Sequence, residues 1–237
     1  MNEKLTGSVP GGHCSRDKHE VVRQAAVYAS GVLSMAGDPA MYQVVERAAR
    51  EFHVPMAAVS VVDRDRQWFP VSIGMDVGET AREVSFCAHA IEQPHEILTV
   101  LDASHDPRFC ANPLVTGESH IRFYLGCPIL DRSGLALGSL CVIDVQPRER
   151  VETAQYERLR ELAQEAANII AYVEVSTTDL KHAGDSIGGQ IEDLVRAGDE
   201  SVVSELDAML RRIERQEEKL WRQQKGRPAS VKPGAAQ

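Results

Sequence analysis

Residues 120–144 read HIRFYLGCPILDRSGLALGSLCVID, and this stretch decides the fold. Between residues 121 and 129 an apolar side chain stands at every second position, which is the period of a strand with one buried face. The tetrapeptide DRSG at 131–134 is typical of a tight turn between two such segments. The sequence therefore predicts a β-hairpin with strands at 120–130 and 135–144.

Segments on either side of this hairpin fit the same sheet and the helices that cover it. The apolar runs 57–62 and 68–73 flank a polar turn and predict a second hairpin, and residues 97–101 predict a further strand. Apolar residues recur at helical spacing in three segments, which are 21–33, 41–52 and 156–173. Because short turns join the strands, the expected fold class is α+β, with a central antiparallel sheet and helices on one face.

Composition divides the chain into four parts. They are a disordered N-terminus (1–17), a globular domain (18–175), a C-terminal helical segment (176–222) and a disordered tail (223–237). The helical segment is expected to be coiled-coil-like, because Leu206, Leu210, Ile213 and Leu220 lie on an a/d seam. We expect the apolar stripes of the helices to form a homodimer or to bind a signalling partner. The alternative is that the last helix folds back onto its own domain.

The net charge and the cysteines limit the compartment and the partners that the sequence predicts. The net charge of −9 disfavours a nucleic-acid partner, since phosphate contacts need a basic surface. No apolar run approaches the roughly 18 residues of a membrane span, and residues 1–18 lack the apolar core of a secretion signal. Cys87, Cys127 and Cys141 stand in apolar segments, where a cysteine behaves as a small hydrophobe. We therefore expect a cytoplasmic protein with reduced thiols and no membrane or nucleic-acid partner.

Several blocks of sequence between residues 83 and 148 carry a family resemblance. In chain order they read EVSFCAHAI, ILTVLDASHDPRF, NPLV, IRFYLGCPI and GSLCVIDVQPR. These blocks strongly resemble the GAF domains of bacterial sensor histidine kinases and diguanylate cyclases, and the resemblance extends over residues 20–175. It implies a ligand cavity on the sheet face away from the terminal helices. The family usually adds an output domain, but no phosphoacceptor histidine context, GGDEF- or EAL-like stretch or Gly-rich nucleotide loop is recognisable here.

The predicted strand 120–130 supplies the first candidate ligand-binding residues. Its alternation places Arg122 and Tyr124 on the face opposite the core residues. Under the resemblance this face borders the cavity, so a guanidinium and a phenol are available to an anionic or polar ligand. The alternative is that Arg122 forms an ion pair with Asp102 or Asp106 and holds the loop that precedes the strand.

That loop, residues 102–119, is long, irregular and rich in Asp, Pro, Asn and Gly. A stretch of this length without regular structure is usually functional in a compact domain. We expect it to close the cavity as a lid, with Asp102, Arg108 and Asn112 as ligand-binding side chains. The alternative is a loop whose Asp and Asn side chains satisfy its own backbone.

The tripeptide Cys87-Ala-His89 adds two candidate ligand-binding side chains. Metal binding is not expected, because zinc sites usually show paired spacings such as C-x2-C and the sequence has none. No cofactor is predicted either. Phytochrome-like GAF domains carry a bilin at a Cys-His pair, whereas here Ser119 precedes His120.

The predicted function is that of a non-catalytic sensor. It binds an unidentified small molecule and relays the signal through helical dimer or partner interfaces. The alternative is a thiol-redox protein, either a redox sensor or an enzyme similar to the free methionine-R-sulfoxide reductases, which would use Cys87, Cys110 and Cys127. No catalytic residue is predicted. Asp144 and Arg148 are expected to form a salt bridge that closes the sheet onto the last helix of the domain.

Overall fold

The computed structural model describes residues 13–176, with side chains described from residue 19 to residue 172. The predictions for the C-terminal helical segment and the tail therefore lie outside the described residues. The chain has two compact units, and the one that holds the sheet spans Val22–Ile191. The elements in chain order are α1 (His13–Ala29), η1 (Val32–Ser34), α2 (Pro39–Glu51), β1 (Met56–Val62), β2 (Arg66–Ile73), β3 (Glu79–Ala81), η2 (Arg82–Val84), α3 (Phe86–Ala90), β4 (Leu98–Val100), α4 (Pro113–Thr116), β5 (Phe123–Leu130), β6 (Ala136–Asp144) and α5 (Thr153–Ser176).

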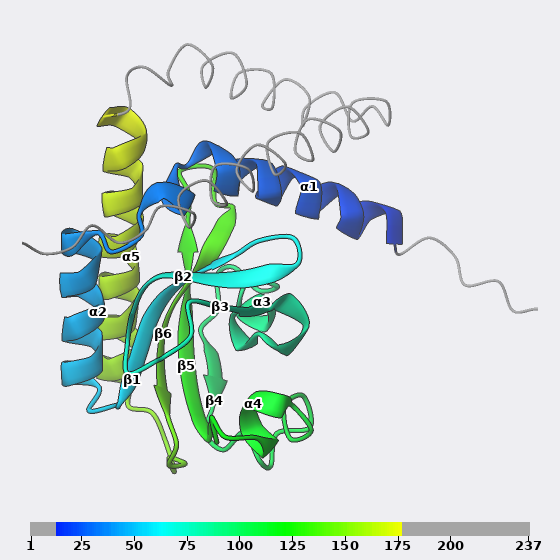
Figure 1. Ribbon diagram of the computed structural model, residues 1–237, viewed down its shortest axis with the longest axis vertical. Helices are drawn as coiled ribbons and strands as arrows, with labels where there is room; N and C mark the ends of the chain where they lie inside the picture. Colours follow the sequence, from blue (N-terminus) through cyan, green and yellow to red (C-terminus); the bar gives the residue numbers. More distant parts are fainter. Residues whose placement is uncertain (1–12, 177–237) are drawn as a thin grey trace, which may run out of the picture. The chain divides into compact units, whose positions relative to one another are not determined.

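Six strands form one antiparallel sheet in the order β3-β2-β1-β6-β5-β4 (Figure 1). The predicted hairpin is present as β5 and β6, and the Asp131 carboxylate accepts the backbone N–H groups of Ser133 and Leu135 in its turn. Strand β5 begins three residues later than predicted, at Phe123. His120 has a φ of 49°, in the left-handed region, so the chain bends before the strand starts. The α+β fold class is confirmed.

Helices α2 and α5 lie side by side on one face of the sheet (Figure 1). Helix α2 starts where the sequence predicts, because Asp38 accepts the backbone N–H of Met41 at 2.9 Å and Pro39 occupies the first turn. Leu159 and Leu162 of α5 are completely buried against the strands. This face is a layer of apolar packing. Helix α1 begins at His13, inside the stretch 1–17 that the sequence predicts to be disordered.

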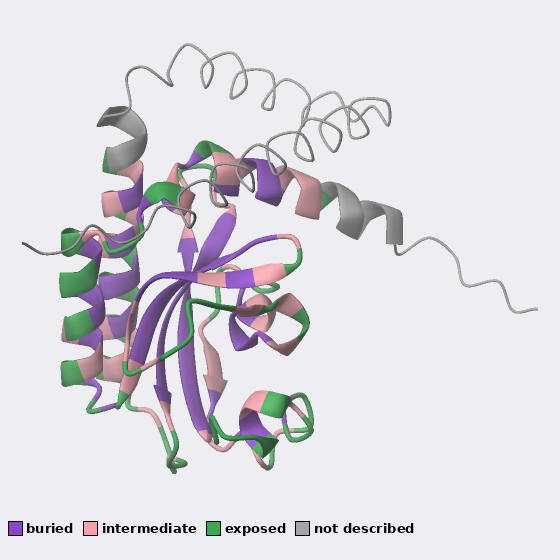
Figure 2. Ribbon diagram, viewed as in Figure 1, coloured by how far each residue is buried: buried purple, intermediate pink, exposed green. Residues whose placement is uncertain are grey.

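The opposite face of the sheet is covered by α3, α4 and the irregular segments around them (Figure 2). Its apolar cluster includes Phe86, Phe109, Val115, Ile121 and Tyr124. The strands are therefore buried on both sides, which explains why β5 and β6 consist of almost continuous apolar residues. Helix α4 and strand β3 are absent from the sequence prediction, in which residues 102–119 are wholly irregular.

Two arginines attach the helices to the sheet. Arg23 of α1 is 3% exposed and donates to the carbonyl of Val62 at 2.7 Å, at the end of β1. Arg148 lies 3.7 Å from the Asp144 carboxylate, which confirms the predicted ion pair. Arg148 also donates to the carbonyl of Phe52 at 2.7 Å, so the contact is made with the end of α2 rather than with α5. Within residues 13–176, no helix has both the length and the apolar character needed to cross a bilayer.

Candidate functional site

A cavity of about 350 Å³ lies on the face covered by α3 and α4, away from α2 and α5; we call it the α3-face cavity. Its apolar lining consists of Met56, Phe69, Met75, Val77, Phe86, Leu114, Ile121 and Ile143. Its polar lining consists of Gln67, Asp76, Thr80, Cys87, Glu118, Ser119 and Tyr124. A largely apolar cavity of this volume with a few convergent polar groups is the usual form of a small-molecule site.

A buried thiol is the centre of the polar wall. The Cys87 Sγ atom accepts hydrogen bonds from Gln67 Nε2 and from the Tyr124 hydroxyl, both at 3.1 Å. Gln67 is 4% exposed and Tyr124 is 1% exposed, so these bonds are shielded from water. The three side chains come from β2, α3 and β5, and their mutual hydrogen bonds hold these elements together.

Further buried polar side chains continue this cluster behind the lining. The Tyr124 hydroxyl lies 3.4 Å from Ser139 Oγ, which in turn lies 3.4 Å from Ser60 Oγ. Cys141 Sγ lies 3.9 Å from Cys87 Sγ. Ser60, Ser139 and Cys141 are at most 1% exposed, so the cluster extends into the sheet. We call Ser60, Gln67, Cys87, Tyr124, Ser139 and Cys141 the polar wall.

Local sequence explains how Cys87 and Tyr124 are held. Ser85 caps α3 by accepting the backbone N–H of Ala88 at 2.9 Å, which sets the start of the helix and places Cys87 in its first turn. The Tyr124 ring lies across Gly126, where any Cβ atom would collide with the ring and its hydroxyl. Phe86 packs 5.1 Å from the Tyr124 ring, centroid to centroid. Both polar groups are therefore fixed by packing before any ligand arrives.

The polar wall shifts the acidity of its members in opposite directions. Burial raises the pKa of the Cys87 thiol, but hydrogen bonds from Cys141, Ser139 and the other hydroxyls favour the thiolate and hold that pKa below its usual range. The hydrogen bond with Cys87, together with burial, raises the pKa of Cys141. Burial also raises the pKa of Tyr124, so its hydroxyl keeps its proton and remains a donor. Cys87 is therefore the acidic thiol of the pair.

Thr80 supplies a polar group that the described residues leave unsatisfied. Its Oγ1 atom is buried and has no hydrogen-bond partner among them. Thr80 pairs directly with Gln67 across β2 and β3, and both residues line the α3-face cavity. A buried hydroxyl without a partner is unusual in a folded protein, and here it belongs to a residue that lines the cavity.

The sequence-predicted residues Cys87 and Tyr124 line the α3-face cavity, and Arg122 does not. The Arg122 guanidinium donates to the carbonyls of Val115 and Ile121, at 3.0 and 2.9 Å, and contacts the His120 ring at 2.7 Å. Because β5 starts only at Phe123, Arg122 lies before the strand and not on its cavity face. Arg122 therefore holds the end of the loop, as in the alternative prediction. It does so by donating to the carbonyls of Val115 and Ile121 and not by forming an ion pair with Asp102 or Asp106.

Asp102 and Arg108 also lie outside the cavity lining. Asp102 accepts hydrogen bonds from Ser104 Oγ at 2.6 Å and contacts the His105 ring at 2.9 Å, and the Ser104 bond lowers the pKa of the Asp102 carboxyl. Arg108 forms an ion pair with Asp106 at 2.6 Å, and this pair lowers the pKa of Asp106. These contacts agree with the alternative in which the loop satisfies its own polar groups.

Asn112 and His89 have structural contacts as well. Asn112 caps α4 by accepting the backbone N–H of Leu114 at 2.9 Å, and its Nδ2 atom donates to the carbonyl of Val84 at 3.0 Å. The His89 ring lies edge-on to Phe109, with 5.0 Å between ring centroids. The loop 102–119 nevertheless closes one side of the cavity, since its Leu114, Glu118 and Ser119 line it.

Sequence reasoning missed Gln67 and Thr80. Gln67 has a detectable signal, because it is a polar residue immediately before the predicted strand 68–73, between Arg66 and Trp68. Thr80 has no comparable signal, since β3 is only three residues long. Among the described residues, no three His, Cys, Asp or Glu side chains gather as they would around a metal ion.

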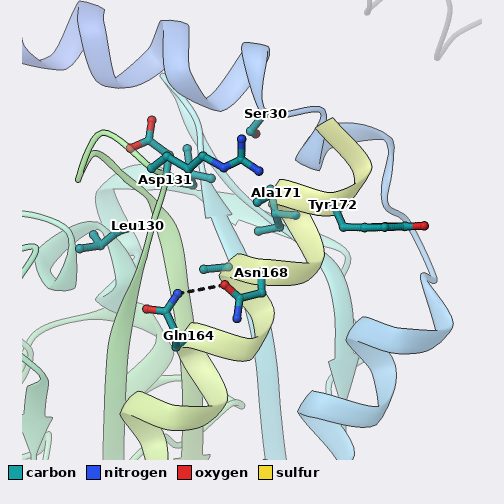
Figure 3. A pocket seen from close by; sticks show the side chains of 11 residues that line it. Ser30, Leu130, Asp131, Gln164, Asn168, Ala171 and Tyr172 are labelled. Carbon is teal, nitrogen blue, oxygen red and sulfur yellow. Dashed lines mark hydrogen bonds between the residues drawn. The ribbon is translucent and has the colours of Figure 1, made fainter. Parts of the chain in front are cut away.

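A second hollow of about 350 Å³ lies on the other face, between the turn of β5 and β6, Ser30 and the last turns of α5 (Figure 3). We call it the helix-side hollow. Four of its polar side chains are exposed, those of Arg132, Gln164, Asn168 and Tyr172, and Gln164 Nε2 donates to Asn168 Oδ1 at 3.2 Å. Ser30 is buried, and its hydroxyl donates to the carbonyl of Val27 at 2.8 Å. The α3-face cavity is equally large but has buried polar groups aimed at it, which makes it the better candidate for a specific site.

Comparisons with known proteins identify a family and several proteins to which this chain is similar. The family model described as "GAF domain" matches residues 37–171. Cyclic di-GMP phosphodiesterase PA2567 of Pseudomonas aeruginosa is 46% identical over 132 residues, which are 56% of this chain and 22% of that protein. This chain thus spans about a fifth of the length of that relative.

Solved structures of similar domains have lower sequence identity. The GAF domain of a phosphoenolpyruvate-protein phosphotransferase from Acinetobacter is 19% identical, with a TM-score of 0.48, over 70% of this chain and 97% of that one. A putative GAF sensor protein from Burkholderia vietnamiensis is 17% identical, with a TM-score of 0.43, over 65% of this chain and 98% of that one.

Proposed function

The chain belongs to the GAF domain family, and from that membership we propose that it is a sensor that binds a small molecule in the α3-face cavity without converting it. The observation that carries the proposal is the polar wall within an otherwise apolar cavity. Apolar lining supplies affinity by burying ligand surface, and a few fixed polar groups supply orientation. Gln67, Cys87 and Tyr124 are fixed in this way, because each bonds to another member of the wall.

The proposed signal passes through the sheet to the long helices. Tyr124 of β5 lines the cavity, whereas its neighbours Phe123 and Leu125 belong to the apolar core that β5 shares with α2 and α5. A ligand that favours one position of β5 therefore also favours one position of α5. We propose that α5 and the chain beyond it pass this change to a second copy or to a signalling partner in the cytoplasm.

The relative from Pseudomonas aeruginosa supports a shared module and not shared catalysis. It is named a cyclic di-GMP phosphodiesterase, and this chain matches only 22% of it. The sequence shows no GGDEF- or EAL-like stretch. The proposed role is accordingly that of a sensor whose output lies in other residues or in another protein.

Native mass spectrometry of the gently purified full chain tests this proposal. Met75→Trp fills the α3-face cavity, because Met75 is a half-buried lining residue. Asn168→Trp is the matched control, since Asn168 is exposed and lines the helix-side hollow. We expect a bound small molecule in the wild type and in Asn168→Trp, and its loss in Met75→Trp. If the bound molecule is retained in Met75→Trp and lost in Asn168→Trp, the proposal is contradicted.

A second candidate function rests on the 3.9 Å separation of Cys87 Sγ and Cys141 Sγ. We propose as the alternative that this pair senses peroxide. Hydrogen peroxide oxidises the Cys87 thiolate to a sulfenic acid and is itself reduced to water. The Cys141 thiol then attacks the Cys87 sulfur, a disulfide forms, and the hydroxyl of the sulfenic acid leaves as a second water.

Peptide mass spectrometry after mild peroxide treatment distinguishes the two candidates. The redox function requires a Cys87–Cys141 disulfide that disappears on reduction, and Cys141→Ser must leave Cys87 as a sulfenic acid or a more oxidised form. The exposed Cys110 is the internal reference for unselective oxidation. If Cys110 is oxidised before Cys87, the pair is structural and the redox function is excluded.

A further inference from the structure

The charge of the lining limits which molecules the α3-face cavity accepts. Its charged residues are Asp76 and Glu118, and both are acidic and exposed. No Lys, Arg or His is found among the lining residues that the structure describes. A cavity entrance bordered by one sign of charge concentrates counter-ions and repels ions of its own sign. The net charge of −9 on the whole chain acts in the same direction.

The nearest candidate cation in the sequence does not alter this balance. Arg122 follows the lining residues Ser119 and Ile121 closely, but its guanidinium donates to the carbonyls of Val115 and Ile121. Those bonds keep the side chain at the end of the loop, outside the lining. A carboxylate or phosphate that entered the cavity would therefore lose its water without gaining a charged partner, which is strongly unfavourable.

The groups that remain suit an uncharged or positively charged molecule. Phe69, Phe86 and Tyr124 contribute aromatic rings to the lining, and aromatic rings attract cations and pack on apolar groups. The partnerless Thr80 hydroxyl and the Gln67 amide form a neutral polar corner, because the two residues pair across β2 and β3. A neutral hydrogen-bonding group or an amine can lie beside this corner without requiring an opposite charge.

We infer that the α3-face cavity is a site for an uncharged or cationic small molecule with an apolar body, and that it rejects anions. This inference rests on the proposed function and narrows its ligand. The sequence predicts that Arg122 and Tyr124 bind an anionic or polar ligand, and the inference retains the polar ligand but not the anionic one.

Cys87 provides a direct test, because it lines the cavity and cysteine thiolates react with methanethiosulfonates that reach them. In each reaction the thiolate attacks the sulfur of the transferred group, a mixed disulfide forms, and methanesulfinate leaves. Three reagents share this chemistry and differ in charge: the methyl reagent is neutral, the 2-(trimethylammonium)ethyl reagent is cationic, and the 2-sulfonatoethyl reagent is anionic. The exposed Cys110 of the same chain is the reference for the intrinsic rate of each reagent.

The measured quantity is the rate of modification at each cysteine of the intact chain, followed by peptide mass spectrometry. We expect the ratio of the anionic to the cationic rate to be about tenfold lower at Cys87 than at Cys110. In the variant Asp76→Asn/Glu118→Gln the difference in this rate ratio between Cys87 and Cys110 must become smaller. Glu149→Gln, which changes an exposed residue outside the lining, must leave the difference unchanged. High salt must also reduce it.

Two other outcomes overturn the inference in different ways. If the anionic reagent modifies Cys87 as readily, relative to Cys110, as the cationic one does, the cavity does not discriminate by charge, although it remains accessible. If none of the three reagents reaches Cys87 while all modify Cys110, the cavity is closed to small molecules. The second result contradicts the proposed function itself, so the two failures are distinguishable.

Discussion

The two faces of the sheet are both buried, but they are built from different chemistry. On the face under α2 and α5, residues such as Leu125, Leu140 and Leu162 are fully buried and purely apolar. On the face under α3 and α4, the apolar cluster contains a cavity and the polar wall around Cys87 and Tyr124. Each face borders a hollow of about 350 Å³, but the one on the α3 face is lined by buried polar side chains that already bond to one another.

The comparison teaches where specificity is located in this fold. A close-packed apolar layer has no room and no directional groups for a ligand. A polar cluster in a protein interior is tolerated only when its members bond to one another, and such a cluster fixes the positions of its side chains.

The largest expected effect is the loss of packing under α5. Leu162→Ala removes a completely buried side chain from the helix-covered face and should lower the free energy of unfolding by about 2–5 kcal/mol. Met75→Ala, at the half-buried edge of the cavity, is the control and should cost less than about 1 kcal/mol. Urea unfolding measures both. Equal losses would show that the cavity face is packed as tightly as the helix-covered face.

A smaller effect is expected where Tyr124 crosses Gly126. Gly126→Ala places a methyl group against the Tyr124 ring and should cost about 1–3 kcal/mol, because the ring must leave its position in the polar wall. In a Tyr124→Ala background the same change should cost much less. A double-mutant cycle by chemical denaturation gives this coupling, and additive costs would mean that the ring does not depend on the glycine.

The smallest effect is expected in the loop 102–119. Asn112→Ala removes the cap of α4 and the bond to the Val84 carbonyl, and should cost about 1 kcal/mol. Arg108→Gln breaks a partly exposed ion pair with Asp106 and should change stability by less than about 1 kcal/mol. Thermal denaturation compares the two variants. If Asn112→Ala leaves stability intact but abolishes ligand binding, Asn112 is a ligand-binding residue, as predicted from sequence.

Much of the fold follows from local sequence patterns, whereas the site depends on contacts between residues that are far apart in the sequence. The hairpin around Asp131 and the start of α2 at Asp38 have turn and capping signals within a few residues, so the sequence predicts both. Helix α4 also has such a signal, since Asn112 and Pro113 form a cap followed by a first-turn proline, but it was obscured by the irregular composition of the loop.

The polar wall has no local signature. Cys87 and Cys141 are 54 residues apart, and each stands in an apolar segment that predicts only burial. Their proximity arises from the packing of α3 on β6, which no spacing rule describes. For Arg122 a local pattern is present but misleading. The strand alternation assigns Arg122 to the cavity face only if β5 starts before it, whereas β5 starts at Phe123. An error of three residues in the start of a strand is enough to misplace a side chain.

Methionine methyl groups allow the most direct test of the claim that the ligand site lies on the α3 face. The chain has six methionines; Met56 and Met75 line the α3-face cavity, whereas Met35 and Met41 are buried in the core on the other face. Tryptamine, an aromatic cation, is the probe, and its contacts are read as intermolecular NOEs in a chain labelled with ¹³C-methyl methionine. The account predicts NOEs from the ring protons to Met56 and Met75 and none to Met35 or Met41. NOEs to Met35 or Met41, or their absence at Met56 and Met75, would contradict it.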